Sequence, residues 1–327
     1  MRFPLPDKPA VRVPAFLFPL ALIPLFDHNA YHIDLLTNIF IYALLAMGLN
    51  IVVGFTGLLN LGYAAFFAIG AYTYALANLH WGVPFWVGLP LGGLAAMLFG
   101  VVVGLPSIRV RGDYLAITTL GFGEIVRILF NNLDQWTGGP NGLLGIARPR
   151  VFGWAFSVNS TPYFYLTLAL VALTAFLLFR MTDSKFGRAL VAIREDELAA
   201  GCMGVPVVKV KLWAFGLSSF IAGIAGVVFA SKQTIVTPDS FDFVLSVLIL
   251  AMVVLGGLGN IWGAMLGALI LGLLPELLRG FASYRMLLFG LLMILIMMFR
   301  PQGILGGQRI RRELAARRSR GSADGAA

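Results

Sequence analysis

The sequence predicts an all-α fold: a polytopic transmembrane helix bundle of about ten spans, in which some helices are broken or re-entrant. Of its 327 residues, 59% are hydrophobic and only 12% are charged, and the mean hydropathy is +0.88. A soluble domain carries about 25% charged residues. The apolar residues form solid runs, whereas the strands of a membrane β-barrel would alternate between apolar and polar positions. The composition therefore excludes a soluble enzyme, a disordered chain and a disulfide-rich secreted domain.

The expected spans are apolar runs that reach or approach about 20 residues, the length that crosses a bilayer. They lie near residues 14–27, 33–53, 63–80, 84–105, 114–133, 161–180, 212–231, 241–256, 260–278 and 284–300. The first run is short and contains Pro19 and Pro24, and no small-residue cleavage site follows it. We therefore expect an uncleaved anchor. The eighth run is also short and begins near Asp242.

The distribution of positive charge predicts the orientation, because loops rich in Lys and Arg remain in the cytoplasm. With both termini cytoplasmic and ten alternating spans, 18 of the 24 Lys and Arg residues fall inside and five fall outside. The chain then divides into a cytoplasmic segment 1–13, one transmembrane domain over 14–305 and a basic cytoplasmic tail 306–327. The basic residues flank spans, so the expected partner is the lipid bilayer and no nucleic acid is expected.

Several kinds of enzyme chemistry have no motif in this sequence. The glycine-rich phosphate-binding loop that ends in Gly-Lys-Ser/Thr does not occur, so we expect no ATP hydrolysis by this chain. The single cysteine, Cys202, excludes an intrachain disulfide and a cysteine metal cluster. His28, His32 and His80 fall at the outer boundary, where an interfacial belt explains them. We expect no enzyme, no metal site and no cofactor, and transport is the default function.

Polar residues interrupt the apolar sequence in two ways. The run 54–63 contains helix-breaking residues and predicts either a tight cytoplasmic turn or a broken, substrate-facing segment. A similar run at 257–261 is either a chance match to 57–61 or the trace of a duplicated transporter. Glu124 and Arg127 share one helical face near the midplane of the fifth span. We expect this pair to face the bundle interior, where it either contacts substrate or ties helices together.

Two loops are long enough to meet partner proteins. In the inner loop 181–211, good helix formers over 189–203 precede Gly204 and Pro206 and predict a short polar helix. This helix is either a docking element or a solvated connector. The outer loop 134–160 contains the turn sequence 137–142 and is either a landing surface for a partner or a passive connector.

Six motifs occur in an order that is characteristic of a known family. They are the runs 56–66, 111–124, 137–142, 192–197, 256–260 and 300–303. With these motifs the chain resembles, over roughly residues 33–306, the membrane permease subunit of the branched-chain amino acid ABC importers. The resemblance implies an importer in the bacterial inner membrane with a second, homologous permease subunit, two cytoplasmic ABC ATPase subunits and a periplasmic substrate-binding protein. ATP would be used by the partner subunits.

The resemblance also implies roles for individual residues. In such importers a short cytoplasmic helix of the permease seats on each ATPase, and the run 197–201 is similar to the core of that coupling loop, from which it departs at Leu198. The residues expected to contact the ATPase are Arg194, Glu195, Asp196, Glu197, Ala200 and Gly201. The residues expected along the substrate path are Thr56, Asn60, Tyr63, Thr118, Thr119, Glu124 and Asn260.

The implied activity is ATP-driven import of branched-chain or related amino acids. Related permeases carry urea, short amides or other amino acids, which are the alternative substrates. A stand-alone carrier or channel is an alternative of a different class, and for such a protein the loop 183–211 would be dispensable.

Overall fold

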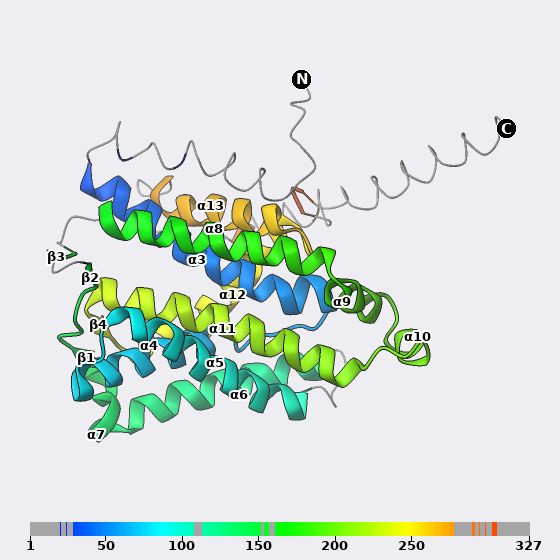
Figure 1. Ribbon diagram of the computed structural model, residues 1–327, viewed down its shortest axis with the longest axis horizontal. Helices are drawn as coiled ribbons and strands as arrows, with labels where there is room; N and C mark the ends of the chain where they lie inside the picture. The colour runs from blue at the N-terminus through cyan, green and yellow to red at the C-terminus, as the bar shows by residue number, and fades with distance from the viewer. Residues whose placement is uncertain are drawn as a thin grey trace.

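The computed structural model describes residues 29–107, 113–151, 154–156, 161–277 and 303–305, together with the single positions 20, 24, 290, 291, 294 and 298. Long helices dominate these ranges and run roughly side by side along the molecule (Figure 1). They are α3 (Ala30–Thr56), α4 (Tyr63–Trp81), α5 (Phe85–Ser107), α6 (Asp113–Asn132), α8 (Thr161–Asp183), α11 (Val207–Gln233), α12 (Phe243–Gly256) and α13 (Ile261–Leu277). These eight helices coincide with the second to ninth expected spans, whereas the first and tenth spans and the tail lie outside the described ranges.

Five segments within the described ranges are long and apolar enough to cross a membrane by length and composition. They are 30–56, 85–106, 161–183, 207–233 and 238–256, the last including the 3₁₀ turn η2 (Pro238–Phe241) before α12. Helix α13 is apolar but has only 17 residues. The protein is therefore a polytopic helical membrane protein.

The connections gather at the two ends of the bundle. One end carries the helix pair α9 (Lys185–Glu195) and α10 (Glu197–Cys202), on the right of Figure 1. The opposite end carries α7 (Asp134–Thr137), η1 (Gly139–Asn141) and the strands β1 (Leu143–Leu144), β2 (Arg150–Val151), β3 (Trp154–Ala155) and β4 (Ile235–Val236). This separation matches the inner and outer loops of the alternating arrangement that the sequence predicts. We call these the α10 end and the β end.

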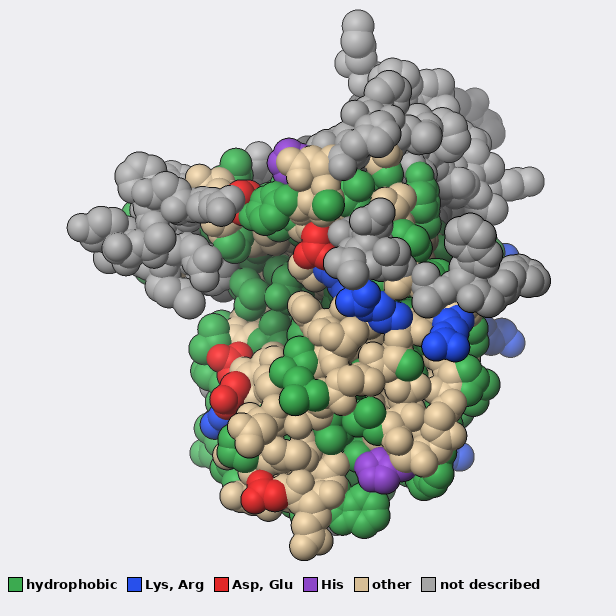
Figure 2. Space-filling model, turned by 90° about the vertical axis from the view of Figure 1, so that its left-hand side faces the viewer, with side chains coloured by type: hydrophobic (Ala, Val, Ile, Leu, Met, Phe, Trp, Pro, Cys, Tyr) green, Lys and Arg blue, Asp and Glu red, His purple; other side chains and the backbone are tan. Residues whose placement is uncertain are grey.

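The four short strands depart from the all-α prediction. Strand β1 pairs antiparallel with β4, with Leu143 opposite Val236, and β2 pairs with β3. The loop 134–160 thereby joins the connection between α11 and α12, which satisfies backbone groups of both segments. Figure 2 faces this end and shows described charged side chains of both signs scattered over it, without a large patch of one sign.

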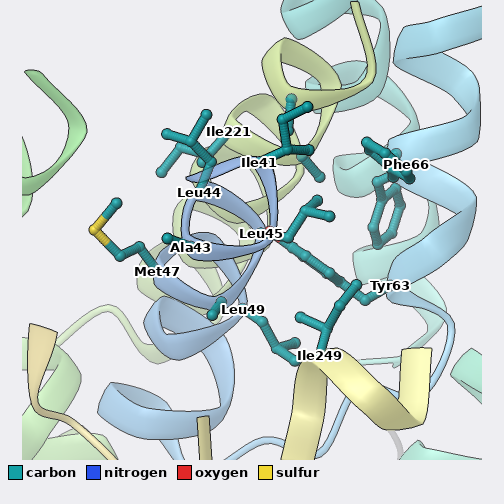
Figure 3. Close-up of a cluster of buried hydrophobic side chains, with 14 of the residues drawn as sticks. Ile41, Ala43, Leu44, Leu45, Met47, Leu49, Tyr63, Phe66, Ile221 and Ile249 are labelled. Atoms are coloured by element: carbon teal, nitrogen blue, oxygen red, sulfur yellow. The ribbon is translucent and has the colours of Figure 1, made fainter. Parts of the chain in front are cut away.

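Helix α3 lies at the centre of the bundle. In its most apolar stretch 94% of the residues are buried, against 33% in α8, so α3 is the central helix and α8 is peripheral. Leu45 of α3, Tyr63 and Phe66 of α4, Ile221 of α11 and Ile249 of α12 belong to one buried cluster (Figure 3). Residues from four helices thus share a single core.

Two turns with the same design break the bundle at the α10 end. The C-cap of α3 is Gly57 (φ 73°) and that of α12 is Gly257 (φ 116°), backbone conformations that favour glycine. In the first turn the Asn60 side chain accepts a hydrogen bond from the backbone N–H of Gly62, and in the second Asn260 accepts from Trp262. The sequence echo therefore corresponds to a shared local structure, and both turns lie at the same end of the molecule.

Candidate functional site

The helix pair α9–α10 at the α10 end forms because capping residues define each helix. Ser184 caps α9, and Asp196 ends α9 and caps α10 by accepting hydrogen bonds from the backbone N–H groups of Leu198 and Ala199. The single helix predicted over 189–203 is therefore wrong. An extended Asp196 (φ −156°) splits it in two, because its carboxylate offers the next turn a new N-cap.

Helix α10 and the residue that follows it expose large apolar side chains away from the bundle. Leu198 is 68% exposed and Met203 is 85% exposed. Of the predicted coupling residues, Arg194, Glu195, Asp196 and Gly201 are exposed, Glu197 is partly buried and Ala200 is buried against the bundle. We call Leu198, Met203, Glu195 and Gly201 the α10 surface; these residues and the neighbouring Ala199 and Cys202 are accessible to another protein.

Two of the predicted coupling residues bind their own chain. Arg194 Nη1 donates to the backbone carbonyl of Gly54, 2.6 Å away, in the last turns of α3. Glu197 Oε1 lies 2.7 Å from Lys211 Nζ on α11, and the Lys211 side chain is only 3% exposed. These charges therefore fasten the helix pair to α3 and α11.

The first turn, 57–62, packs against α6 and brings two predicted path residues together. The backbone N–H of Leu61 donates to Thr119 Oγ1 over 3.1 Å, and Gly62 lies against the Thr119 carbonyl, where a Cβ would approach to 2.0 Å. Asn60 is buried next to this contact, and its Nδ2 has no hydrogen-bond partner. A buried amide without a partner costs about 1–3 kcal/mol, so Asn60 is a predicted path residue with an unused hydrogen-bond donor.

Three other predicted path residues are occupied by internal hydrogen bonds. Tyr63 donates through its hydroxyl to the Ser218 carbonyl over 3.0 Å, and Thr56 donates to the Val52 carbonyl of its own helix. Asn260 Nδ2 donates to the Leu305 carbonyl over 3.0 Å. Structural roles therefore account for Thr56, Tyr63 and Asn260 in this conformation.

The Glu124–Arg127 pair lies on the surface of the subunit. Arg127 Nε is 2.9 Å from Glu124 Oε2, and the two side chains are 34% and 32% exposed. Arg127 Nη1 also approaches Asp239 of η2 at 3.5 Å. The pair is thus only partly buried in the single chain, and its expected place inside the bundle stays a prediction. The cost of placing ionised side chains in lipid applies to the whole assembly, in which a neighbouring subunit or water can cover the pair.

Asn50 is a buried polar residue that the sequence reasoning did not single out. Its Oδ1 accepts from the backbone N–H of Gly259 over 2.9 Å, and its Nδ2 donates to the Asn260 carbonyl over 3.2 Å. Asn50 thereby holds the second turn, 257–260, against α3. The sequence does carry a signal for this residue, because Asn50 is an asparagine among the apolar residues of a 27-residue helix.

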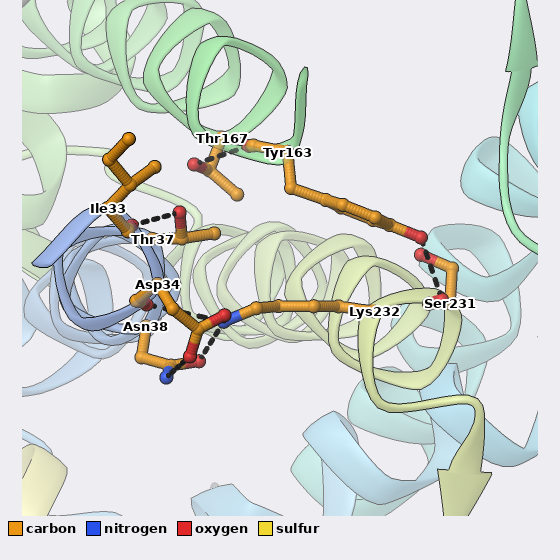
Figure 4. Close-up of polar contacts among 8 residues, drawn as sticks. All are labelled: Ile33, Asp34, Thr37, Asn38, Tyr163, Thr167, Ser231 and Lys232. Carbon is orange, nitrogen blue, oxygen red and sulfur yellow. Dashed lines mark hydrogen bonds and ion pairs between the residues drawn. The ribbon is translucent and has the colours of Figure 1, made fainter. Parts of the chain in front are cut away.

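A second buried polar cluster lies toward the β end (Figure 4). Lys232 Nζ on α11 lies 2.9 Å from Asp34 Oδ1 and donates to Asn38 Oδ1 over 2.7 Å, both on α3. Tyr163 on α8 donates to the Ser231 carbonyl over 2.8 Å. These contacts tie α3, α8 and α11 together near the β end. In the described ranges, no three His, Cys, Asp or Glu side chains gather to hold a metal ion.

Apolar helices of membrane length, with a helix pair projecting at one end, define a multi-pass membrane protein. The chain belongs to the family described as branched-chain amino acid transport system / permease component, whose model matches residues 31–297. No solved structure gives a significant match.

Similar curated proteins carry the same description. The chain is 43% identical to the high-affinity branched-chain amino acid transport system permease protein LivM of Salmonella typhimurium, covering 96% of this chain and 80% of that protein. It is 44% identical to the LivM protein of Escherichia coli, covering 93% and 78%. The LivH permease protein of Salmonella typhimurium is 28% identical over 81% of this chain and 91% of its own length.

Proposed function

We propose that this chain is a membrane-spanning permease subunit of an ATP-driven importer that carries branched-chain or related amino acids. Membership in the permease family and the printed names of the LivM and LivH relatives support the substrate class. The observation that carries the proposal for this structure is the α10 surface, an exposed helix at one end of an otherwise apolar bundle. Such a helix gives an ATPase a place to bind.

The proposed assembly contains a second, homologous permease, two cytoplasmic ATPases and a periplasmic binding protein in the bacterial inner membrane. Ten spans with both termini in the cytoplasm agree with the excess of Lys and Arg on the α10 side. The sequence contains no glycine-rich phosphate loop, so ATP is hydrolysed by the partners. The loop 134–160 at the β end is the proposed contact for the binding protein.

We place the substrate path along α6, with Thr118 on the exposed side of the helix and the Glu124–Arg127 pair on its flank. Ionised side chains within a membrane span avoid lipid, so the partly exposed Glu124 and Arg127 are expected to face protein or water. Thr118 is exposed on the same helix, and Thr119 contacts the turn that contains Asn60. Covered by the second permease, this face becomes the wall of a path between the two subunits. Thr56, Tyr63 and Asn260 then support the wall from behind.

The experiment that tests the proposal is purification of the tagged protein with its partners from bacterial membranes. Glu197 is unsuitable for substitution because it is the counterion of the buried Lys211. We compare the wild type with Leu198→Asp on the α10 surface, and use Leu144→Asp as the matched control. Leu144 is exposed to a similar degree, 63%, but lies at the β end.

We expect an ATPase to co-purify with the wild type and with Leu144→Asp, and to be lost with Leu198→Asp. Uptake of labelled leucine by the assembled complex, with urea and acetamide as competitors, then identifies the substrate. If no ATPase accompanies the wild type in mild detergent, the importer proposal fails and a stand-alone carrier or channel replaces it.

A further inference from the structure

We infer that Arg194 is the positioning residue through which the helix pair α9–α10 moves both broken turns of the bundle, and that it is not a docking contact for the ATPase. The inference rests on the proposed function. Arg194 leaves the end of α9 and donates through Nη1 to the Gly54 carbonyl. Arg194 is an exposed residue, but this hydrogen bond ties its side chain to the bundle.

The side chain of Arg194 lies in a socket built from glycines of both turns. A Cβ on Gly259 would lie 3.1 Å from Arg194 Nη1, and a Cβ on Gly57 would lie 3.4 Å from Arg194 Cγ. Both glycines have left-handed backbone, with φ of 75° and 73°. Arg194 thus contacts the first turn and the second turn at once, although about 200 residues separate the two turns in the sequence.

The charge of Arg194 suits this place. Helix α3 ends at Thr56, and the guanidinium of Arg194 binds the Gly54 carbonyl in the last turn of this helix. A helix C-terminus carries a partial negative charge that favours a cation. Hydrogen bonds from an ionised donor are also stronger than neutral ones. Arg194 therefore binds the C-terminal turn of α3 through a charged group and packs against Gly259 of the second turn.

Further hydrogen bonds connect this socket to the rest of the α10 end. One turn before Gly54, Asn50 binds Gly259 and Asn260. Asn260 in turn binds the Leu305 carbonyl, and the backbone N–H of Ile304 donates to the Leu255 carbonyl over 2.8 Å. A displacement of α9 is thus passed to α3, to the second turn and to the segment 303–305. The first turn lies against Thr119 of α6, the helix that we place along the substrate path.

The test uses the assembled importer, reconstituted in vesicles with its binding protein. The variants are Arg194→Ala and Arg194→Lys, with Arg188→Ala as the matched control. Arg188 lies on the same helix, but its Nη1 donates to the exposed carbonyl of Asp183 in the adjoining turn. Three quantities are measured: the amount of co-purified ATPase, ATP hydrolysis without binding protein, and substrate imported per ATP.

We expect Arg194→Ala to keep the wild-type amount of ATPase and basal hydrolysis but to import about tenfold less substrate per ATP, the loss expected from one charge-assisted hydrogen bond. Arg194→Lys restores part of the import, and Arg188→Ala behaves as the wild type. Loss of the ATPase from Arg194→Ala complexes, or wild-type import per ATP, overturns the inference. If Arg194→Ala does not reach the membrane, substrate imported per ATP is measured for Arg194→Lys instead. A wild-type ratio for that variant overturns the inference. Absence of ATPase from the wild type instead defeats the proposed function.

Discussion

Buried polar side chains in this bundle bind backbone groups of neighbouring helices. Tyr63 donates to the Ser218 carbonyl, Ser218 donates to the Gly48 carbonyl, and Ser246 accepts from the backbone N–H of Ala64. In an apolar surrounding each of these groups would otherwise lack a partner, at a cost of several kcal/mol in lipid. Such bonds therefore fix how the helices are placed along one another.

Asn50 provides the clearest test of such a bond. Asn50→Leu leaves the Gly259 N–H and the Asn260 carbonyl without their partner, which costs about 1–3 kcal/mol for each buried group. We expect a lower thermal unfolding temperature of the purified subunit in detergent. Thr73→Val is the control. Among the hydrogen bonds described, the Thr73 side chain makes one, to the Ile69 carbonyl of its own helix. Equal unfolding temperatures for the two variants would contradict the role of Asn50.

The Glu197–Lys211 pair predicts a reversible loss of stability. Glu197→Ala leaves a buried ammonium unpaired, at a cost of about 3 kcal/mol, the low end for a buried pair because Glu197 is partly exposed. Adding Lys211→Met removes the charge, so we expect the double variant to regain most of the unfolding temperature. A double-mutant cycle in detergent measures this coupling. Additive losses would show that the two side chains do not interact.

At the scale of the helices, the close packing of α5 against α11 depends on small residues. Gly88, Gly92, Ala96, Gly100 and Gly104 recur at every fourth position of α5. A Cβ on Gly100 would lie 2.2 Å from Ser219 Oγ of α11, and a Cβ on Gly223 of α11 would lie 2.6 Å from the Gly92 carbonyl. Small residues let helix backbones approach closely in membranes. This row of small residues thus replaces large apolar side chains as the means of helix association.

Substitution of Gly223 tests this packing. A valine at this position would meet the backbone of α5, and overpacking costs about 1–3 kcal/mol or more. We expect Gly223→Val to lower the yield of monodisperse protein in size-exclusion chromatography. Gly121→Val is the matched control, because Gly121 is also helical but has open space around its Cβ position. Comparable losses in both variants would assign the effect to valine in a helix and not to packing.

For the whole molecule, the sequence predicts well where the helices lie along the chain, but it predicts poorly which helices contact one another. The expected span near 212–231 corresponds to α11 over 207–233, because the apolar run defines the middle of a helix while its polar ends continue past the run. The sequence reasoning placed Arg194 and Glu197 at the ATPase, but their observed contacts, Gly54 and Lys211, come from other helices. Spacing along one helix cannot reveal such contacts. The Asn60 and Asn260 turns were detectable because a turn is local.

The orientation of the whole molecule can be tested with its natural cysteine. Cys202 is the single cysteine of the chain, and it is exposed on α10. If the α10 end is cytoplasmic, a membrane-impermeant maleimide labels the wild type in inside-out vesicles and not in intact spheroplasts. Cys202→Ser combined with Leu144→Cys moves the thiol to the β end and should reverse this pattern, while Cys202→Ser alone gives no label. Labelling of the wild type in spheroplasts would invert the proposed topology. Stripping peripheral proteins from the vesicles with urea should also increase labelling of Cys202, because a bound ATPase covers the α10 surface.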